Sequence, residues 1–167
     1  MLLNVRILTS LLLCNFFIEV AVARLLNYRV YTIVPNVSWG ANLRHECDML
    51  AIDGGGRLTE IEIKISMSDL KADFKKKHNH ESKIISRLVY AMPEKMIEKG
   101  LPLIPKWSGI ISVRWTGNSF KAKWVRLARH RHEGKPTDGQ IKNIMRLGCM
   151  RIWSLKEHNY NTQNKGK

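Results

Sequence analysis

Two acidic residues and one lysine have types and spacing that could bind a metal ion or exchange a proton. Asp48 lies in the strand-like segment 46–52, and Glu62 and Lys64 lie in the next such segment, 58–66. Side chains two residues apart on a strand point to the same face of the sheet. Glu62 and Lys64 are therefore expected to share a face, and Asp48 joins them if the two segments pair in the right register.

The turn between these segments sets the register. Residues 53–57 read Asp-Gly-Gly-Gly-Arg, which is a turn signal. A turn there places Ile52 opposite Leu58. By the same register Asp48 lies opposite Glu62, with Cβ atoms about 4.5–5.5 Å apart. Two ionised carboxylates about 5 Å apart repel by roughly 3 kcal/mol at an effective dielectric near 20. Such a pair persists when a divalent cation bridges it, when a proton is shared, or when a nearby ammonium neutralises it.

The same residues also fit an ordinary amphipathic strand. From Glu60 to Ile65 charged and apolar residues alternate, which is the period of a half-exposed strand. In that interpretation Glu62 and Lys64 face solvent and Asp48 is an edge or turn residue. A register slip of one residue would also move Asp48 and Glu62 to opposite faces.

The remaining elements place this hairpin in an α/β fold. The order is a helix, three strands, a helix and a strand, followed by a hairpin and a last helix, which predicts a mixed sheet flanked by helices. We expect one domain over 1–158 and a flexible basic tail at 159–167. The predicted helices are about Thr9 or Ser10 to Leu26, Ser66 or Ser68 to about His80, and Thr137 to about Leu155; the predicted strands are 28–34 (closed by Pro35), 46–52, 58–66, 87–92, 109–115 and 119–127.

The first segment allows two interpretations. As a buried helix, it carries Glu19 in apolar company, which is costly unless the acid is paired, protonated or bound to a cation. As a signal peptide, it offers a basic Arg6, an apolar stretch and a small-residue site at 21–23, and cleavage would remove Glu19. Glu19 next to the supposed site and polar residues in the stretch favour the helix.

Charge indicates the class of partner. The 167 residues include 28 Lys and Arg against 14 Asp and Glu, a formal net charge of +14. Such an excess favours a polyanionic partner, either nucleic acid or an anionic membrane surface. The three cysteines form no C-x-x-C pair, so a disulfide framework or a zinc knuckle is not expected. Cys47 is interpreted as a small buried neighbour of Asp48.

An acid on an apolar helix, an Asp in a strand, a Gly-rich turn, and E-x-K in the next strand before a basic helix resemble the PD-(D/E)XK nuclease superfamily. The resemblance covers the order of elements from about Thr9 to Met92. The chain is similar to small stand-alone bacterial and phage members of this superfamily, including those linked to DNA repair. The resemblance implies a restriction-endonuclease-like core. Its motifs are Pro35–Gly40 (PNVSWG), His45–Asp48 (HECD), Glu60–Lys64 (EIEIK) and Ser68–His78 (SDLKADFKKKH).

The resemblance implies a metal-dependent DNA endonuclease. Asp48 and Glu62 would bind Mg²⁺ or Mn²⁺, Glu19 would complete the metal site, and Lys64 would be the catalytic lysine. Carboxylate oxygens suit such ions, which lower the pKa of a bound water and screen the phosphate. Lys64 would orient the water, act on its proton or bind a phosphate oxygen. The sequence departs from the motif at Cys47, where the pattern has proline.

Two basic groups are candidates for DNA contact, and an ordinary solvated surface is the alternative for each. We expect a cytoplasmic protein that binds DNA and has no stable membrane association; a secreted protein is the alternative if 1–23 are a signal peptide. A homodimer is allowed by the resemblance, and a non-catalytic DNA-binding protein on the same fold is the rival function. The basic candidates are Lys71, Lys75, Lys76, Lys77 and Lys83 in the first group, and Arg126, Arg129 and Arg131 in the second.

Overall fold

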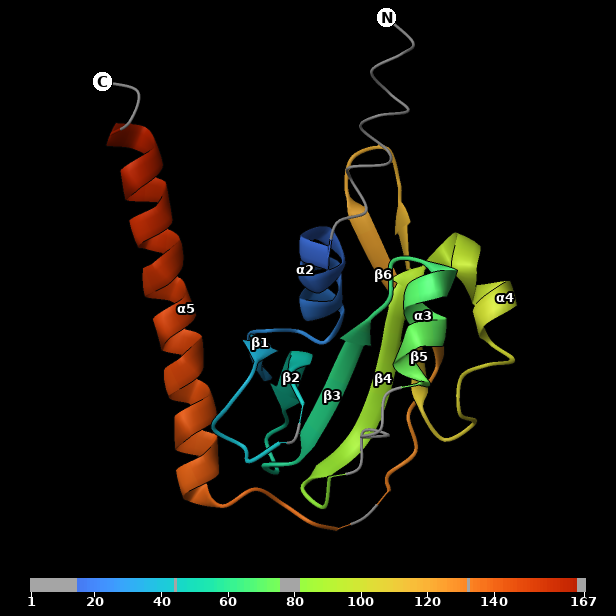
Figure 1. Cartoon of the computed structure of the whole chain (residues 1–167), viewed down its shortest axis with the longest axis horizontal. Helices are drawn as coiled ribbons and strands as arrows, with labels where there is room; N and C mark the ends of the chain where they lie inside the picture. The colour runs from blue at the N-terminus through green and yellow to red at the C-terminus, as the bar shows by residue number, and fades with distance from the viewer. Residues whose placement is uncertain (1–14, 44, 76–81, 132, 165–167) are drawn as a thin grey trace, which may run out of the picture.

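The computed structural model describes residues 15–43, 45–75, 82–131 and 133–164, and shows a sheet with helices on both faces (Figure 1). The start of the first predicted helix and residues 76–81 lie outside the described part. The elements in chain order are α2 (Asn15–Leu25), β1 (Thr32–Val37), β2 (Cys47–Ile52), β3 (Leu58–Ile63), α3 (Met67–Asp73), β4 (Ile85–Pro93), the 3₁₀ turn η1 (Glu94–Met96), α4 (Ile97–Gly100), β5 (Gly109–Trp115), β6 (Phe120–Arg126) and α5 (Asp138–Asn164).

The six strands form one mixed sheet in the order β1-β2-β3-β4-β5-β6. β3, β4 and β5 are parallel, whereas β1–β2, β2–β3 and β5–β6 pair in antiparallel fashion. Parallel neighbours need a crossover, and α3 supplies one between β3 and β4 while η1 and α4 supply the next. The predicted α/β architecture, consistent with a restriction-endonuclease-like core, is confirmed.

Helices cover the two faces of the sheet in different ways. α2 packs on one face, where Ile18 and Val22 are fully buried against apolar residues of β2 to β6. α3 and α4 pack on the opposite face, with Leu70 in a cluster that includes Tyr90. α5 packs on that second face beside β1 through Ile144 and Leu147. Every described side chain of α5 after Gly148 is exposed.

The hairpin of β2 and β3 has the predicted register. Ile52 pairs with Leu58 and Met49 pairs with Ile61. The turn is closed because Asp53 accepts hydrogen bonds from the amides of Gly55 and Arg57, both at 2.9 Å. Continued by one residue, this register brings Asp48 opposite Glu62, so both side chains belong to the same face.

The first strand differs from the prediction of 28–34 closed by Pro35. β1 begins at Thr32 and includes Pro35. It begins later because Asn27 adopts a left-handed φ of 61° and its carbonyl accepts from the amide of Val30 at 2.8 Å, which makes a turn there. Proline is tolerated because β1 is an edge strand, where a missing amide donor need not break a ladder.

Three predicted ends also differ. β3 ends at Ile63, short of the predicted 66, and α3 ends at Asp73, short of the predicted His80. α5 runs to Asn164, beyond the end predicted near Leu155, because no Gly or Pro interrupts 149–164. The predicted tail therefore begins in a helix.

The interpretation of 1–23 as a signal peptide conflicts with the packing of α2. Ala21 and Val22, in the supposed cleavage site, are buried in the core beneath this helix. The described part of the first segment is therefore packed into the domain, as the buried-helix interpretation predicts. Among the described residues no helix combines the length and apolar composition needed to cross a membrane.

Candidate functional site

The site predicted from sequence lies where β2 begins and β3 ends. Glu62 and Lys64 are 2 % and 3 % exposed, so they do not form the solvent-exposed face of an amphipathic strand, which was the alternative interpretation. Asp48 is half-buried, and its Oδ2 accepts a hydrogen bond of 2.7 Å from the amide of Ile63, next to Glu62. Asp48, Glu62 and Lys64 thus gather at one place.

Lys64 is held by acids from two elements. Its Nζ donates to Oε2 of Glu62 at 2.7 Å and to Oδ1 of Asp73 at 3.0 Å. The hydroxyl of Tyr90, on β4, donates to Oδ2 of Asp73 at 3.2 Å. These four side chains are buried and make a continuous network beneath α3.

Asp73 and Tyr90 were not predicted as site residues. Asp73 follows Leu70 by three residues on α3, so both lie on the buried face of the helix. An acid at such a position is a signal that the sequence contains. Tyr90 carries no such signal, because its role depends on the pairing of Glu62 with Tyr90 across the parallel strands.

Two side-chain hydrogen bonds cap the start of α3. The side chain of Ser66 accepts from the amide of Asp69 at 3.1 Å, and Asp69 in turn accepts from the amide of Ile65 at 3.2 Å. The predicted cap at Ser66 is confirmed. By fixing the start of α3 directly after β3, it brings Asp73 back over Lys64.

Burial makes the ionised form of Glu62 costly. Desolvation raises the pKa of Glu62 to about 7, and the charges of Asp48 and Glu60 act in the same direction against the lowering effect of Lys64. Its Oε1 is buried and has no hydrogen-bond partner among the described residues. A buried carboxylate oxygen of this kind can receive a proton or a cation.

Lys64 shows the complementary shift. Burial alone would lower its pKa, but the charges and hydrogen bonds of Glu62 and Asp73 outweigh that effect, so the pKa of Lys64 is raised. Lys64 therefore keeps its proton at neutral pH and can donate hydrogen bonds.

Glu19 extends the cluster from α2. It is half-buried, and its pKa is raised first by burial and then by the negative charge of Asp48. Glu19 is thus near enough to Asp48 for the two charges to interact, and it comes from the helix on the sheet face opposite α3.

The donor set fits a hard divalent cation. Glu19, Asp48 and Glu62 offer carboxylate oxygens, which are the ligands that Mg²⁺ and Mn²⁺ prefer. The buried, unpartnered Oε1 of Glu62 and the mutual repulsion of the acids are what such a cation would relieve. These residues would hold the ion.

The basic candidates differ in their surroundings. Lys71 and Lys75 on or just after α3, and Lys83 before β4, are exposed, whereas Lys76 and Lys77 lie outside the described residues. Arg126 is half-buried and donates to the carbonyls of Ser108 and Pro105 at 2.9 and 2.7 Å, so it fixes a loop.

The other two arginines lie near the opposite end of the parallel strands. The guanidinium of Arg131 stacks 4.7 Å from the centroid of the Trp107 ring. The backbone amide of Arg131 donates to the carbonyl of Ser86 near the start of β4. Arg129 is exposed, and its amide donates to the carbonyl of Trp107. The second basic group is therefore not brought beside Glu62 and Lys64, which lie at the opposite end of β3.

Comparison with known proteins adds the family. Over residues 13–157 the chain matches the family model described as DNA repair protein MmcB-like. A solved structure, the SPO1766 protein of unknown function from Silicibacter pomeroyi, is similar in fold, with a TM-score of 0.60 at 20 % sequence identity over 86 % of this chain and 88 % of that chain. No curated protein matches the chain. The family match spans most of the sequence, including α2 and both strands of the site, and the chain belongs to the MmcB-like family of DNA repair proteins.

Proposed function

We propose that this protein is a metal-dependent DNA endonuclease of the PD-(D/E)XK type that hydrolyses phosphodiester bonds during DNA repair in the cytoplasm. The family supports the link to DNA repair. One observation supports the catalytic step: Asp48 and Glu62 lie together with Lys64 on one face of β2 and β3, and Glu62 has a buried oxygen without a hydrogen-bond partner among the described residues.

Each side chain has a role that its surroundings favour. Bound Mg²⁺ or Mn²⁺ would lower the pKa of a water and screen the phosphate. Asp48 and Glu62, with Glu19 at the edge, supply the negative charge that binds the ion. The hydrogen bond from Ile63 to Asp48 fixes the direction of that carboxylate at 2.7 Å.

Lys64 acts as a donor in this scheme. Because Glu62 and Asp73 hold its ammonium at 2.7 and 3.0 Å, it keeps its proton and its position. It would therefore donate to a phosphate oxygen or to the attacking water and stabilise the negative charge that develops. Asp73 and Tyr90 are positioning residues in this scheme because they act through Lys64.

Substrate binding is assigned to the exposed surface around α3. The chain has a net charge of +14; Lys71 lies on the short helix that places Asp73 over Lys64, and Lys75 lies just after that helix. Lysines of this kind contact the DNA backbone without reading its sequence.

The test is cleavage of supercoiled plasmid by the purified protein with Mg²⁺, with Mn²⁺ and with a chelator. Asp48→Asn and Lys64→Gln are expected to lower the cleavage rate at least about 100-fold while salt-sensitive DNA binding is kept. Glu98→Gln is the matched control, because Glu98 is an exposed acid on α4. Circular dichroism checks the fold of each variant.

Two outcomes would contradict the proposal. Cleavage that survives both Asp48→Asn and Lys64→Gln would show that the activity has another source. A wild-type protein that shifts DNA without divalent metal and nicks no DNA under any condition would instead be the non-catalytic DNA-binding protein expected as the rival.

A further inference from the structure

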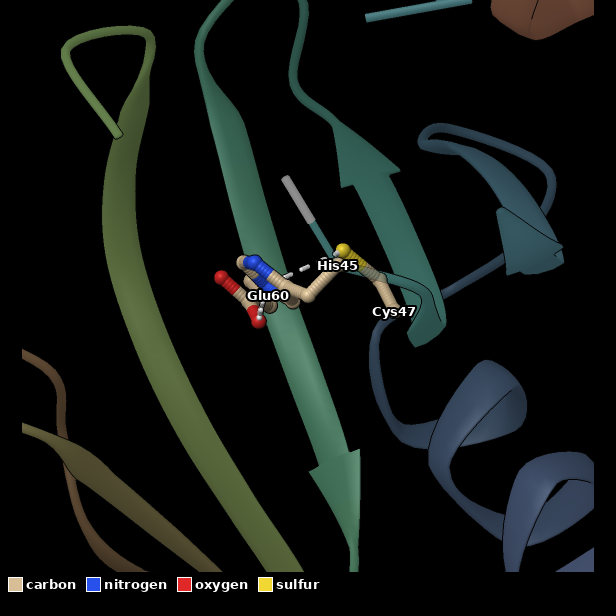
Figure 2. Close-up of side chains that lie close together, drawn as sticks. All are labelled: His45, Cys47 and Glu60. Carbon is tan, nitrogen blue, oxygen red and sulfur yellow. Dashed lines mark hydrogen bonds and ion pairs between the residues drawn. The ribbon is translucent and has the colours of Figure 1, made fainter. Parts of the chain in front are cut away.

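A second group of potential ligands lies beside the carboxylate site. His45, Cys47 and Glu60 each offer one ligand atom, and these three atoms lie within 4.8 Å of one another. Nε2 of His45 is 2.6 Å from Oε1 of Glu60 and 3.8 Å from Sγ of Cys47. Figure 2 shows the three side chains converging: Glu60 from β3, Cys47 from the start of β2 and His45 from the segment just before β2.

Two of the three ligand–ligand distances can be compared with those that one metal ion requires. Zn²⁺ binds sulfur at about 2.3 Å and nitrogen or oxygen at about 2.0–2.2 Å, so tetrahedral ligand atoms lie roughly 3.3–3.6 Å apart. The sulfur–nitrogen distance is close to this range. The His45–Glu60 distance would have to grow by about 1 Å, as happens when an ion replaces the shared proton between the two groups.

The ligand types differ from those of the neighbouring site. Thiolate and imidazole select borderline transition metals such as Zn²⁺, whereas Mg²⁺ takes oxygen ligands. Cys47 is fully buried, so its thiol is shielded from disulfide exchange at the surface.

We propose that His45, Cys47 and Glu60 bind one transition-metal ion of the Zn²⁺ class at a site separate from the carboxylates of Asp48 and Glu62. Three protein ligands leave the fourth tetrahedral position to water. Cys47 directly precedes Asp48, and Glu60 stands two residues before Glu62 on the same face. The ion ties the start of β2 to β3 and so fixes the two carboxylates relative to each other.

Cobalt(II) is the probe, because a cobalt–thiolate bond absorbs in the near ultraviolet. The 167-residue chain is used with Cys14→Ser and Cys149→Ser, which leaves Cys47 as the single thiol. The thiolate-to-cobalt band is expected to saturate at one equivalent. One equivalent of Zn²⁺ should remove it, and a large excess of Mg²⁺ should not.

Three variants in this background locate the site. Cys47→Ser should abolish the band, and His45→Gln should weaken cobalt binding at least about tenfold. Asp48→Asn should keep the band while plasmid cleavage is lost, which separates this proposal from that of the nuclease. Circular dichroism and thermal melting confirm that each variant folds, and added Zn²⁺ should raise the melting temperature of the background protein more than that of Cys47→Ser.

Two results would overturn the assignment. The first is a folded background protein that binds no cobalt through sulfur. The second is a band that disappears in Asp48→Asn yet survives in His45→Gln, since the ion would then belong to the carboxylate site.

Discussion

Glu62 is expected to make the stability of the metal-free protein fall as the pH rises from about 4.5 to about 7. Burial raises the pKa of Glu62 from 4.5 to about 7, so the folded state binds the proton more tightly than the unfolded state does. The contribution of the protonated group to stability is complete below the unfolded pKa. It is lost as the pH rises through the folded pKa.

The size of the effect follows from the shift. Each pKa unit corresponds to roughly 1.4 kcal/mol, so a rise from 4.5 to about 7 amounts to about 3 kcal/mol in the free energy of unfolding. Glu62→Gln removes this titration because the amide stays neutral. When the pH is raised from about 4.5 to about 8, the free energy of unfolding of the wild type should therefore fall by about 3 kcal/mol relative to that of Glu62→Gln.

Urea denaturation in the presence of a chelator, followed by circular dichroism at several pH values, measures this difference. Saturating Mg²⁺ should restore stability to the wild type at about pH 8 and have a smaller effect on Glu62→Gln, because the cation replaces the proton. Glu98→Gln, an exposed change, should follow the wild type at every pH. Parallel pH curves for wild type and Glu62→Gln would refute the reasoning.

Two further predictions concern packing and DNA binding. A Cβ at Gly109 would lie 2.9 Å from the backbone nitrogen of Ala128, so Gly109→Ala should cost about 1–3 kcal/mol in urea denaturation, whereas Gly54→Ala, with open space around the new atom, should change stability by less than about 0.5 kcal/mol. Replacing both Lys71 and Lys75 with Gln should weaken DNA binding equally for all sequences. Fluorescence anisotropy at several salt concentrations should show a shallower slope of log affinity against log salt. Its magnitude should decrease by about 0.9 for each phosphate that is no longer neutralised. An unchanged slope would remove α3 from the DNA-binding surface.

The register of β2 and β3 was predictable because one short turn determines it. A turn at 53–57 leaves a single pairing for Ile52 and Leu58, and every later pair follows from it, including the approach of Asp48 to Glu62. The two helix caps were also predictable, because each joins residues only three positions apart. Gln140 and Thr137 bind each other's amides at the start of α5, and Ser66 binds the amide of Asp69 at the start of α3.

Contacts between distant elements were harder to predict. The hydrogen bonds that surround Lys64 come from α3 and β4, and they depend on how these elements cross the sheet. The His45–Glu60 contact joins residues fifteen positions apart and depends on the path of the chain just before β2. The two carbonyls that the Arg126 side chain binds were also hard to predict, because they belong to the loop before β5 and a local pattern does not show how that loop meets the end of β6.

The short helix α3 connects the two parts of the proposed activity. Its buried face holds Asp73 3.0 Å from the Lys64 ammonium, and its exposed face carries Lys71. With Ser66 fixing its first turn, the helix can move little without changing the position of Lys64. A phosphate backbone bound at Lys71 would therefore contact the same helix, α3, that holds Lys64 in position. The buried and exposed faces of one short helix thus serve the site and the proposed DNA-binding surface.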